Sequence, residues 1–348
     1  MYLPETQTTQ QVLPLGFNCP FCPLKSLGLC EGTFDLKSYS MEHPSLIGCL
    51  NIERLEKHFA DVFDIPEPIP KSYNQHKIEL PSTVFGLTDG RLDLTQFEDF
   101  PQFAVSMNVF IKENGDLSFR DMNHLKTSLK LPLNSKVALI GTSSELKQQA
   151  IWKASKKLNI WKRIAEFDFA WVTSTSFSVW DINPRSDQII NQRRNYFVSD
   201  ILANFGVPTI PFVYPFDDCD YKNFRSWINL RPDINKLAVL AQYYNTDEQF
   251  EQLVKNMHRI QESAGRSIQF LIVGAAKKTK IIRALSSFGN CSFVSTNPYA
   301  QAVAGNRYDN DFNRIKRLDL TKPEVWFSNY KTFFNVIESL RNKDFNQN

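Results

Sequence analysis

The sequence predicts an α/β protein, a (β/α)8 TIM-barrel-like domain preceded by a small module that carries four cysteines. Two observations predict the barrel: short, continuously apolar runs recur along residues 101–348, and amphipathic helical segments separate them. Continuous apolar runs are typical of parallel strands that are buried on both faces. A doubly wound open sheet is the alternative architecture for the same alternation of elements.

Up to eight strands are expected in this region, at 103–111, 137–142, 167–175, 207–214, 236–242, 267–275, 290–296 and 314–320. The segments between them have helical periodicity. The helix expected at 144–163 has an apolar stripe of Leu146, Ala150, Ile151, Ala154, Leu158 and Trp161. Thr246 and Gln249 form a capping-box pattern, and Thr321 is expected to cap the last helix. Eight such units in about 240 residues fit a barrel.

Residues 1–100 are expected to form the N-terminal module, and residues 101–348 the barrel domain. The N-terminal part holds the cysteines, an amphipathic helical pattern at 51–63, and four prolines between residues 66 and 81. A proline-rich stretch of this kind favours an extended strap rather than a helix or a central strand.

Cys19, Cys22, Cys30 and Cys49 lie within 31 residues, with the spacing C-x2-C-x7-C-x18-C. A C-x-x-C pair brings two thiolates to one ion, and two further thiolates complete a tetrahedral set. The pattern predicts a metal site that holds either structural zinc or a [4Fe–4S] cluster, since both use four thiolates. Proline after each of the first two cysteines and apolar residues between the ligands favour the iron–sulfur alternative. Buried free thiols or a single redox pair are the remaining interpretations.

A reducing, cytoplasmic compartment is expected for this chain. No run of about 18 apolar residues is present, and the first 20 residues lack the pattern of a signal peptide, so a cytoplasmic protein without membrane contact is expected. A net charge of +3 permits contact with nucleic acid but does not itself predict it.

Active sites of barrels gather beyond the carboxyl ends of the strands, so residues at those positions are the candidates for function. Asp181 and Asp217 are the candidate catalytic carboxylates. The candidate ligand-binding residues are Ser174, Ser176, Arg193, Arg194, Gln242 and Asn297. Two cations at the start of a helix oppose its dipole, so Arg193 and Arg194 are expected either to bind an anion or to pair with Asp181 or Asp187.

Three basic clusters are further candidates for contact with a nucleotide or nucleic acid, although a solvated helix face is the commoner origin of such patterns. They are Lys153, Lys156, Lys157, Lys162 and Arg163 in the first, Lys277, Lys278, Lys280 and Arg283 in the second, and Arg314, Lys316 and Arg317 in the third.

The stretch "TSTSFSVWDINPRSDQIINQRRNYFVSDILANFGVPTIPFV" resembles the bacterial and phage family of unknown function numbered 4417. The resemblance covers about residues 165–300 and rests on Ser174, Phe177-Ser178, Asp181, Pro184, Gln188-Ile189, Asn191, Arg193-Arg194, Gly206-Val207 and Ile210-Pro211. The family has an acidic residue just before the Phe-Ser pair, where this chain has Ser176. The resemblance therefore implies that any chemistry of that acid is lost or moved in this chain.

A more distant architectural similarity is to the tRNA-guanine transglycosylase-like barrels, which also join a barrel to a four-ligand metal site. The sequence thus predicts a barrel protein of a mobile-element, phage or defence setting that binds a nucleotide, nucleic acid or other anionic ligand at its strand ends. The alternatives are a non-catalytic binding or assembly protein with a protein partner, and an iron–sulfur redox protein.

Overall fold

The computed structural model describes residues 60–62, 68–100, 102–179, 185–316 and 319–344. The four clustered cysteines and Asp181 lie outside these residues. Within them, no helix has both the length and the apolar character needed to cross a membrane.

Eight parallel strands form one sheet in the order β5-β4-β3-β2-β1-β8-β7-β6. They are β1 (Thr83–Leu87), β2 (Phe103–Ser106), β3 (Val137–Ile140), β4 (Val172–Thr173), β5 (Thr209–Ile210), β6 (Lys236–Leu240), β7 (Gln269–Val273) and β8 (Cys291–Ser295). A parallel bridge between Phe212 and Ala238 joins the two end strands, with Ala238 N donating to Pro211 O over 2.8 Å. The sheet therefore closes, which confirms the predicted barrel over the open-sheet alternative.

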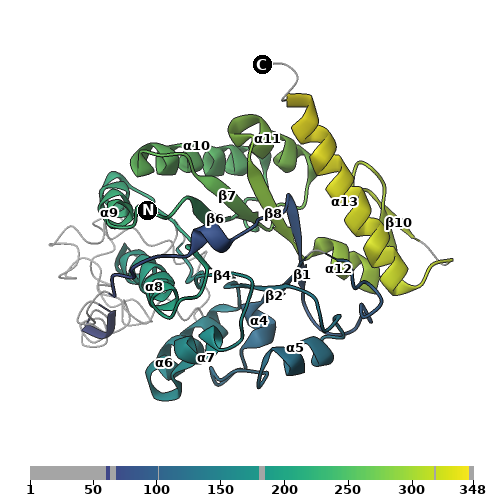
Figure 1. Cartoon of the computed structure of the whole chain (residues 1–348). Coiled ribbons are helices and arrows are strands. Elements are labelled where there is room, and N and C mark those ends of the chain that lie inside the picture. Colours follow the sequence, from purple (N-terminus) through teal and green to yellow (C-terminus); the bar gives the residue numbers. More distant parts are fainter. Residues whose placement is uncertain (1–59, 63–67, 101, 180–184, 317–318, 345–348) are drawn as a thin grey trace, which may run out of the picture.

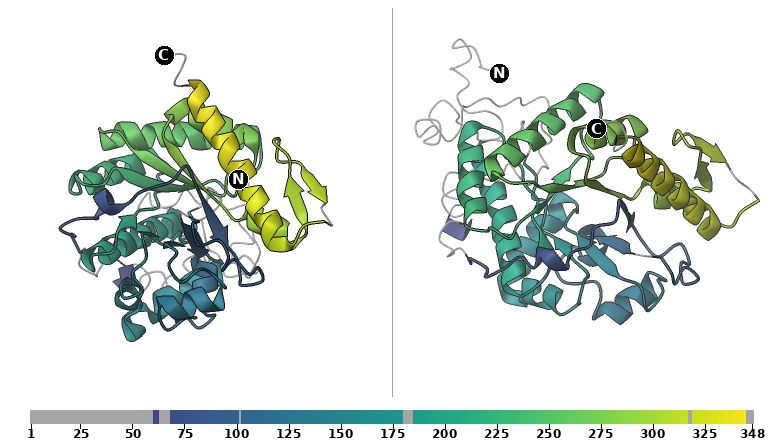
Figure 2. Two further views of the ribbon diagram at one scale, coloured as in Figure 1. Left: turned by 45° about the vertical axis from the view of Figure 1, so that its right-hand side comes forward. Right: turned by 45° about the horizontal axis from the view of Figure 1, so that its top comes forward.

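The barrel differs from the prediction at its first and last strands. β1 pairs with β2 and β8, so the barrel sheet begins within the segment that the sequence analysis assigned to the N-terminal module. The strand expected at 314–320 is instead β10 (Arg314–Lys316), which pairs antiparallel with β9 (Asn306–Tyr308) in a hairpin beside the barrel (Figure 2). Burial explains the difference, because β1 is buried throughout while β10 is exposed throughout.

Helices surround the sheet (Figure 1). They are α4 (Met107–Phe110), α5 (Met122–Ser128), α6 (Glu145–Leu158), α7 (Ile160–Ala165), α8 (Arg185–Asn204), α9 (Asp218–Asn229), α10 (Asp247–Ala264), α11 (Lys278–Phe288), α12 (Asn297–Val303) and α13 (Lys322–Asp344). The capping box of Thr246 and Gln249 is confirmed at the start of α10. The single helix expected at 144–163 is divided at Asn159, whose φ of 49° ends α6 and begins α7.

The barrel has two apolar layers. Its interior is filled by small and branched side chains around two large aromatic residues, Trp171 and Phe212, which are 1% and 0% exposed. The members of this layer include Val84, Ala104, Ala138, Ile140, Ile210, Ala238, Leu271 and Val294. Alternate residues of the same strands, such as Phe85, Phe103, Leu139 and Phe293, face the helices and join the larger outer core. The interior is thus a packed core, as in other barrels of this class.

An extended segment closes the end of the barrel where the strands begin. Residues 68–82, dark blue in Figure 1, cross this end before entering β1 and include the short 3-10 helix η4 (Gln75–Lys77). Nε2 of Gln75 donates to Thr209 O and to Lys236 O, both over 2.9 Å. Oε1 of Gln75 accepts from Asn235 N at 2.8 Å and Lys236 N at 2.7 Å. One side chain therefore joins β5 to β6, where the sheet itself makes only a single bridge.

A buried ion pair anchors the same segment to the helices. Arg231 and Asp200 are each 1% exposed and form a bidentate pair with both N···O distances at 2.6 Å. The Tyr73 hydroxyl donates to Asp200 Oδ1 at 2.5 Å, and Trp227 Nε1 donates to Oδ2 at 3.3 Å. Together with Gln75, which joins β5 to β6, these contacts cover the end of the barrel where the strands begin. The opposite end, where the strands finish, is the open one.

Candidate functional site

The carboxyl ends of the strands surround a cavity of about 550 Å³. Its described lining carries no charged side chain. Hydroxyl and amide groups from several strand ends contribute to it, among them Ser106, Asn108, Thr142, Ser176, Gln242 and Thr296. Aromatic rings form much of the remaining wall, namely Phe177, Tyr214, Phe216, Tyr243 and Tyr244. A cavity of this size and composition is typical of a small-molecule site.

Two glycines let the strand ends approach closely enough to form this cavity. A Cβ on Gly141 would lie 1.8 Å from Ser174 O, so β3 and the residues after β4 touch through bare backbone. Gly141 O in turn accepts from Ser176 N at 3.1 Å, which places Ser176 in the lining. Gly274 has φ of +92°, and a Cβ there would lie 2.8 Å from the Gln242 side chain. Only glycine fits either position without displacing the cavity wall.

Two polar groups of the lining are buried with a hydrogen-bonding position left unfilled among the described residues. Gln148 is 2% exposed, and its amide donates from Nε2 to Ser143 O at 3.2 Å while Oε1 stays unsatisfied. The Tyr214 hydroxyl is also buried; the Ser176 hydroxyl lies close enough to donate to its oxygen, but the Tyr214 O–H has no acceptor among the described residues. Burial raises the pKa of Tyr214 well above its usual value, and the nearby Ser176 hydroxyl offsets this only in part. A buried unpaired acceptor and a buried unpaired hydroxyl are costly unless a ligand satisfies them.

A ring of hydrogen bonds holds the loop that follows β4 beside the cavity. Ser178 Oγ donates to Glu145 Oε2 at 2.6 Å, and Gln149 Nε2 donates to Glu145 Oε1 at 2.9 Å. Arg194 Nη1 donates to Gln149 Oε1 at 3.2 Å and to Asn191 Oδ1 at 3.3 Å. Asn191 Nδ2 then donates to Ser178 O at 2.8 Å, which completes the ring. The ring ties the first turns of α6 to α8 and fixes the wall that Ser178 contributes.

Arg194 lies behind this wall, not in the strand-end cavity. Its guanidinium lies 5.0 Å from the centre of the Trp152 ring and 5.4 Å from that of Phe177. Burial lowers the pKa of Arg194 to about 10, and the carboxylates of Glu145 and Asp187 counteract this. Burial likewise raises the pKa of Asp187 well above its usual value, although Arg194 lowers it in part. Burial thus acts against the charged form of both groups, and their mutual attraction offsets it in part.

The structure brings two of the predicted ligand-binding residues, Ser176 and Gln242, into the cavity lining. Ser174 is fully buried in the barrel wall, where its Oγ accepts from Phe212 N at 2.8 Å. Asn297 begins α12 immediately after the lining residue Thr296, and its own N–H donates to Ser295 Oγ. Neither Ser174 nor Asn297 belongs to the described lining.

The charged candidates lie elsewhere. Asp217 caps α9, where Oδ1 accepts from Asp220 N at 2.8 Å in a capping box. Arg193 is half-buried, and burial lowers its pKa. Neither Asp217, Arg193 nor Arg194 is part of the described lining of the strand-end cavity. Asp181, the other predicted catalytic residue, lies outside the described residues, as do Cys19, Cys22, Cys30 and Cys49.

The sequence analysis missed the lining residues that come from helices rather than strand ends. Gln148 belongs to α6, and Gln249, Gln252 and Asn256 belong to α10. The predicted apolar stripe of α6 was wrong at Leu146, which is 65% exposed, whereas Gln148 is buried. A polar residue that displaces an apolar one from the buried face of a helix often marks a functional site.

Comparisons with known proteins show no family. No family model matches the chain, and no curated protein matches it. The resemblance to the family numbered 4417 and the similarity to transglycosylase-like barrels stay predictions. Two solved structures are similar in outline. A "putative fructose-1,6-biphosphate aldolase" from Coccidioides immitis is 13% identical, covering 86% of this chain and 96% of its own, with a TM-score of 0.38. The YdjI aldolase from Escherichia coli K12 is 14% identical, covering 84% and 95%, also with a TM-score of 0.38. Scores this low carry no argument about activity, and the barrel assignment rests on the strand pairing.

Proposed function

We propose that the strand-end cavity binds a small uncharged ligand that carries a ring and several hydroxyl or amide groups, such as a nucleoside or a small sugar. The observation that carries this proposal is the uncharged, hydrogen-bonding and aromatic lining. An anion such as a phosphate group is bound most strongly by cations and charge-assisted hydrogen bonds. The described lining supplies none, so it favours a neutral ligand over the anionic one that the sequence suggested.

Gln148 and Tyr214 would determine which ligand groups are recognised. Gln148 Oε1 is an acceptor and requires a donor on the ligand, such as a hydroxyl or an N–H group. The Tyr214 hydroxyl can donate to a ligand oxygen or ring nitrogen. The partly exposed rings of Phe216 and Tyr243 would pack against the apolar face of the ligand. A ligand that lacks these donors and acceptors would leave buried polar atoms unpaired and bind more weakly.

A thermal-shift panel tests this proposal. Nucleosides and small sugars are compared with their phosphorylated counterparts, because a ligand that binds only the folded state raises its melting temperature. We expect at least one neutral compound to raise the melting temperature of the wild-type protein and to lose this effect in Tyr214→Phe. Stabilisation by phosphorylated compounds alone, unchanged in Tyr214→Phe, would contradict the proposal.

The four clustered cysteines support a second, separate proposal, namely that they hold zinc or a [4Fe–4S] cluster. Among the described residues, no group of three or more histidine, cysteine or acidic side chains could hold a metal. Cys219 and Cys291 are described as free thiols, and burial raises the pKa of Cys291 to about 12. Anaerobic purification with metal analysis and an absorption spectrum tests the proposal. A brown protein with iron and sulfide supports the cluster, one zinc per chain supports the zinc site, and a metal-free protein refutes both.

The predicted mobile-element, phage or defence setting, the role as a binding or assembly protein with a protein partner, and the redox role all depend on these two sites. They stay predictions.

A further inference from the structure

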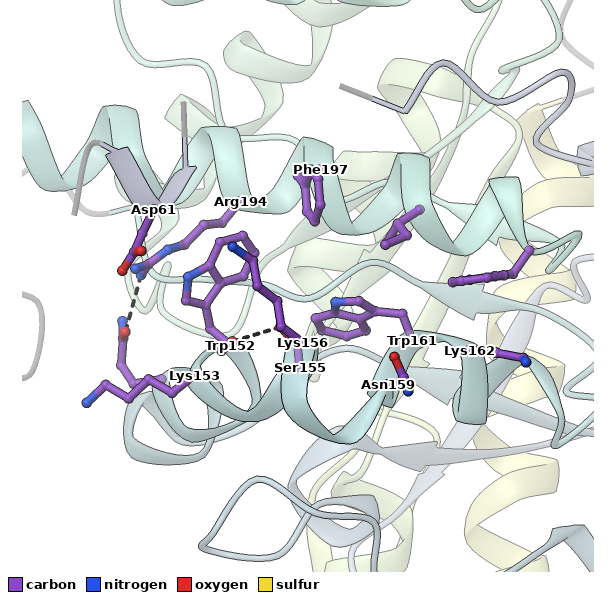
Figure 3. A pocket seen from close by; sticks show the side chains of 13 residues that line it. Asp61, Trp152, Lys153, Ser155, Lys156, Asn159, Trp161, Lys162, Arg194 and Phe197 are labelled. Carbon is purple, nitrogen blue, oxygen red and sulfur yellow. Dashed lines mark hydrogen bonds between the residues drawn. The ribbon is translucent and has the colours of Figure 1, made fainter. Parts of the chain in front are cut away.

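A second cavity, of about 330 Å³, lies on the outer side of the barrel between α6–α7 and α8 (Figure 3). It is separate from the strand-end cavity, because no residue lines both. Arg194 and Gln149 lie in its wall, on the far side of the hydrogen-bond ring from Ser178.

Cations predominate among the charged residues that line the second cavity, whereas the described lining of the strand-end cavity is uncharged. Four cations line it, Lys153, Lys156, Lys162 and Arg194, against the single carboxylate of Asp61. The three lysines are exposed, and within the described ranges none of them takes part in an ion pair. An exposed cluster of unpaired cations in a concave site attracts anions.

The second basic cluster differs, since two of its four cations are already held in ion pairs. On α11, Lys278 pairs with Asp311 at 2.6 Å and Arg283 pairs with Glu251 at 2.5 Å. Lys280 of the same helix donates to Tyr244 O. Among the described residues, the α6–α7 cluster therefore gathers more unpaired lysines in one cavity than the α11 cluster does.

Aromatic and aliphatic side chains form the floor between these cations. Trp152 and Trp161 point from α6 and α7 toward α8, and Phe197 faces them from α8 (Figure 3). Phe205 is 43% exposed and Ile201 is partly buried, so the floor is open to solvent at the end of α8. Trp152 and Lys156 are four residues apart on α6 and so share one helix face, which places a cation beside a ring.

We propose that this cavity binds a nucleoside phosphate, with the base against the exposed ring of Phe205 and the partly exposed ring of Trp152, and the phosphate beside the lysines. Cations combined with exposed rings are the chemistry that recognises nucleotides, because every base offers a π-face and every phosphate a charge. A cavity of about 330 Å³ is of a size for one nucleotide, either free or at the end of a strand. The proposal does not depend on the neutral ligand of the strand-end cavity.

Calorimetric titration of the full-length protein with adenosine monophosphate at low salt tests the proposal. We expect Lys156→Glu to weaken binding by about 10-fold or more, since it replaces an attractive charge by a repulsive one. Lys157→Glu is the matched control: Lys157 is exposed on the same helix but does not line the cavity, so binding should change by no more than about 2-fold to 3-fold. Phe205→Ala should also weaken binding, while Leu146→Ala, which removes an exposed apolar side chain of α6 outside the cavity, should not.

The remaining arms separate the sources of binding. Adenosine and inorganic phosphate should each bind more weakly than the monophosphate, and tighter binding of a short oligonucleotide with the same response to Lys156→Glu would extend the proposal to strand ends. Two results would overturn it directly: no binding by the wild-type protein, or equal weakening by Lys156→Glu and Lys157→Glu. A third would be loss of binding in Gln148→Leu while Lys156→Glu binds as well as the wild type. The last result would place the nucleotide at the strand ends.

Discussion

The Gln75 side chain and the Lys236 backbone exchange two hydrogen bonds: Nε2 donates to Lys236 O at 2.9 Å, and Lys236 N donates to Oε1 at 2.7 Å. This exchange reproduces with a side chain the pattern that two paired strands make with their backbones. It lies where β5 and β6 meet and where the sheet is weakest. The proline-rich stretch, predicted to be an extended strap of the N-terminal module, is therefore part of the closure of the barrel.

Gln75→Ala should destabilise the protein by about 2–4 kcal/mol, because four backbone groups around a buried side chain lose a hydrogen-bond partner at once. Chemical denaturation measures this change. His76→Ala, at the exposed neighbouring position in η4, is the control and should leave stability nearly unchanged. A Gln75→Ala protein as stable as the control would show that β5 and β6 stay joined without the Gln75 side chain.

Arg231→Met should destabilise the protein by about 3–5 kcal/mol, since it leaves the Asp200 carboxylate buried without its charged partner. The double variant Arg231→Met with Asp200→Leu should recover part of that loss, because both charges are then removed together. Comparison of the free energies of unfolding of the two variants checks this. No recovery in the double variant would mean that the pair acts through packing alone.

Asp187→Asn should make stability less dependent on pH. Burial raises the folded-state pKa of Asp187 above the unfolded value of about 3.9, so the unfolded chain releases its proton first. The stability that the buried acid contributes is therefore complete below pH of about 4 and is lost as the pH rises through the folded-state pKa. The wild-type protein should lose stability relative to Asp187→Asn over this range. Asp99→Asn, at an exposed site, should follow the wild-type curve.

Gln148→Leu should change the free energy of unfolding only slightly, because the unpaired Oε1 and the single Nε2 hydrogen bond to Ser143 O are lost together, while it weakens binding in the strand-end cavity by about 10-fold or more. The substitution removes a buried acceptor that has no partner among the described residues and replaces it with an apolar group of similar size. Gln149→Leu is the matched comparison, because the Gln149 amide bonds to both Glu145 and Arg194. It should cost about 1–3 kcal/mol in the free energy of unfolding. A similar loss of stability in both variants would assign Gln148 a structural role.

The barrel could be predicted from the sequence because its strands are buried on both faces and so appear as continuous apolar runs. β2 and β6 to β8 follow this rule. β1 was not predicted, because five residues after a proline-rich stretch are too few to show a clear strand pattern. Its partners, β2 and β8, also come from opposite ends of the barrel domain. The assignment of β10 to the barrel was wrong. Its single isoleucine lies between two cations, and the sequence does not show that all three side chains are exposed.

The site could be predicted only where it follows strand ends. Ser176 and Gln242 were found in this way, whereas Gln148 and Tyr214 depend on which way α6 and the loop after β5 face. The arginines were misleading for the same reason. Arg194 lies on α8, the helix that follows the strand-end loop after β4. The helix directs its side chain between Trp152 and Phe177 and away from the strand-end cavity. Spatial neighbours of this kind are set by helix packing, which a single sequence does not specify.

The central claim is that the strand-end cavity recognises a neutral ligand through unpaired polar atoms. Its most direct test is calorimetric titration, at low and high salt, of the neutral compound with the largest thermal shift. The account predicts an affinity that is nearly independent of salt and that falls by about 10-fold or more in Tyr214→Phe and Gln148→Leu but not in Lys156→Glu. An affinity that drops steeply with salt and is unchanged in Tyr214→Phe and Gln148→Leu would contradict it.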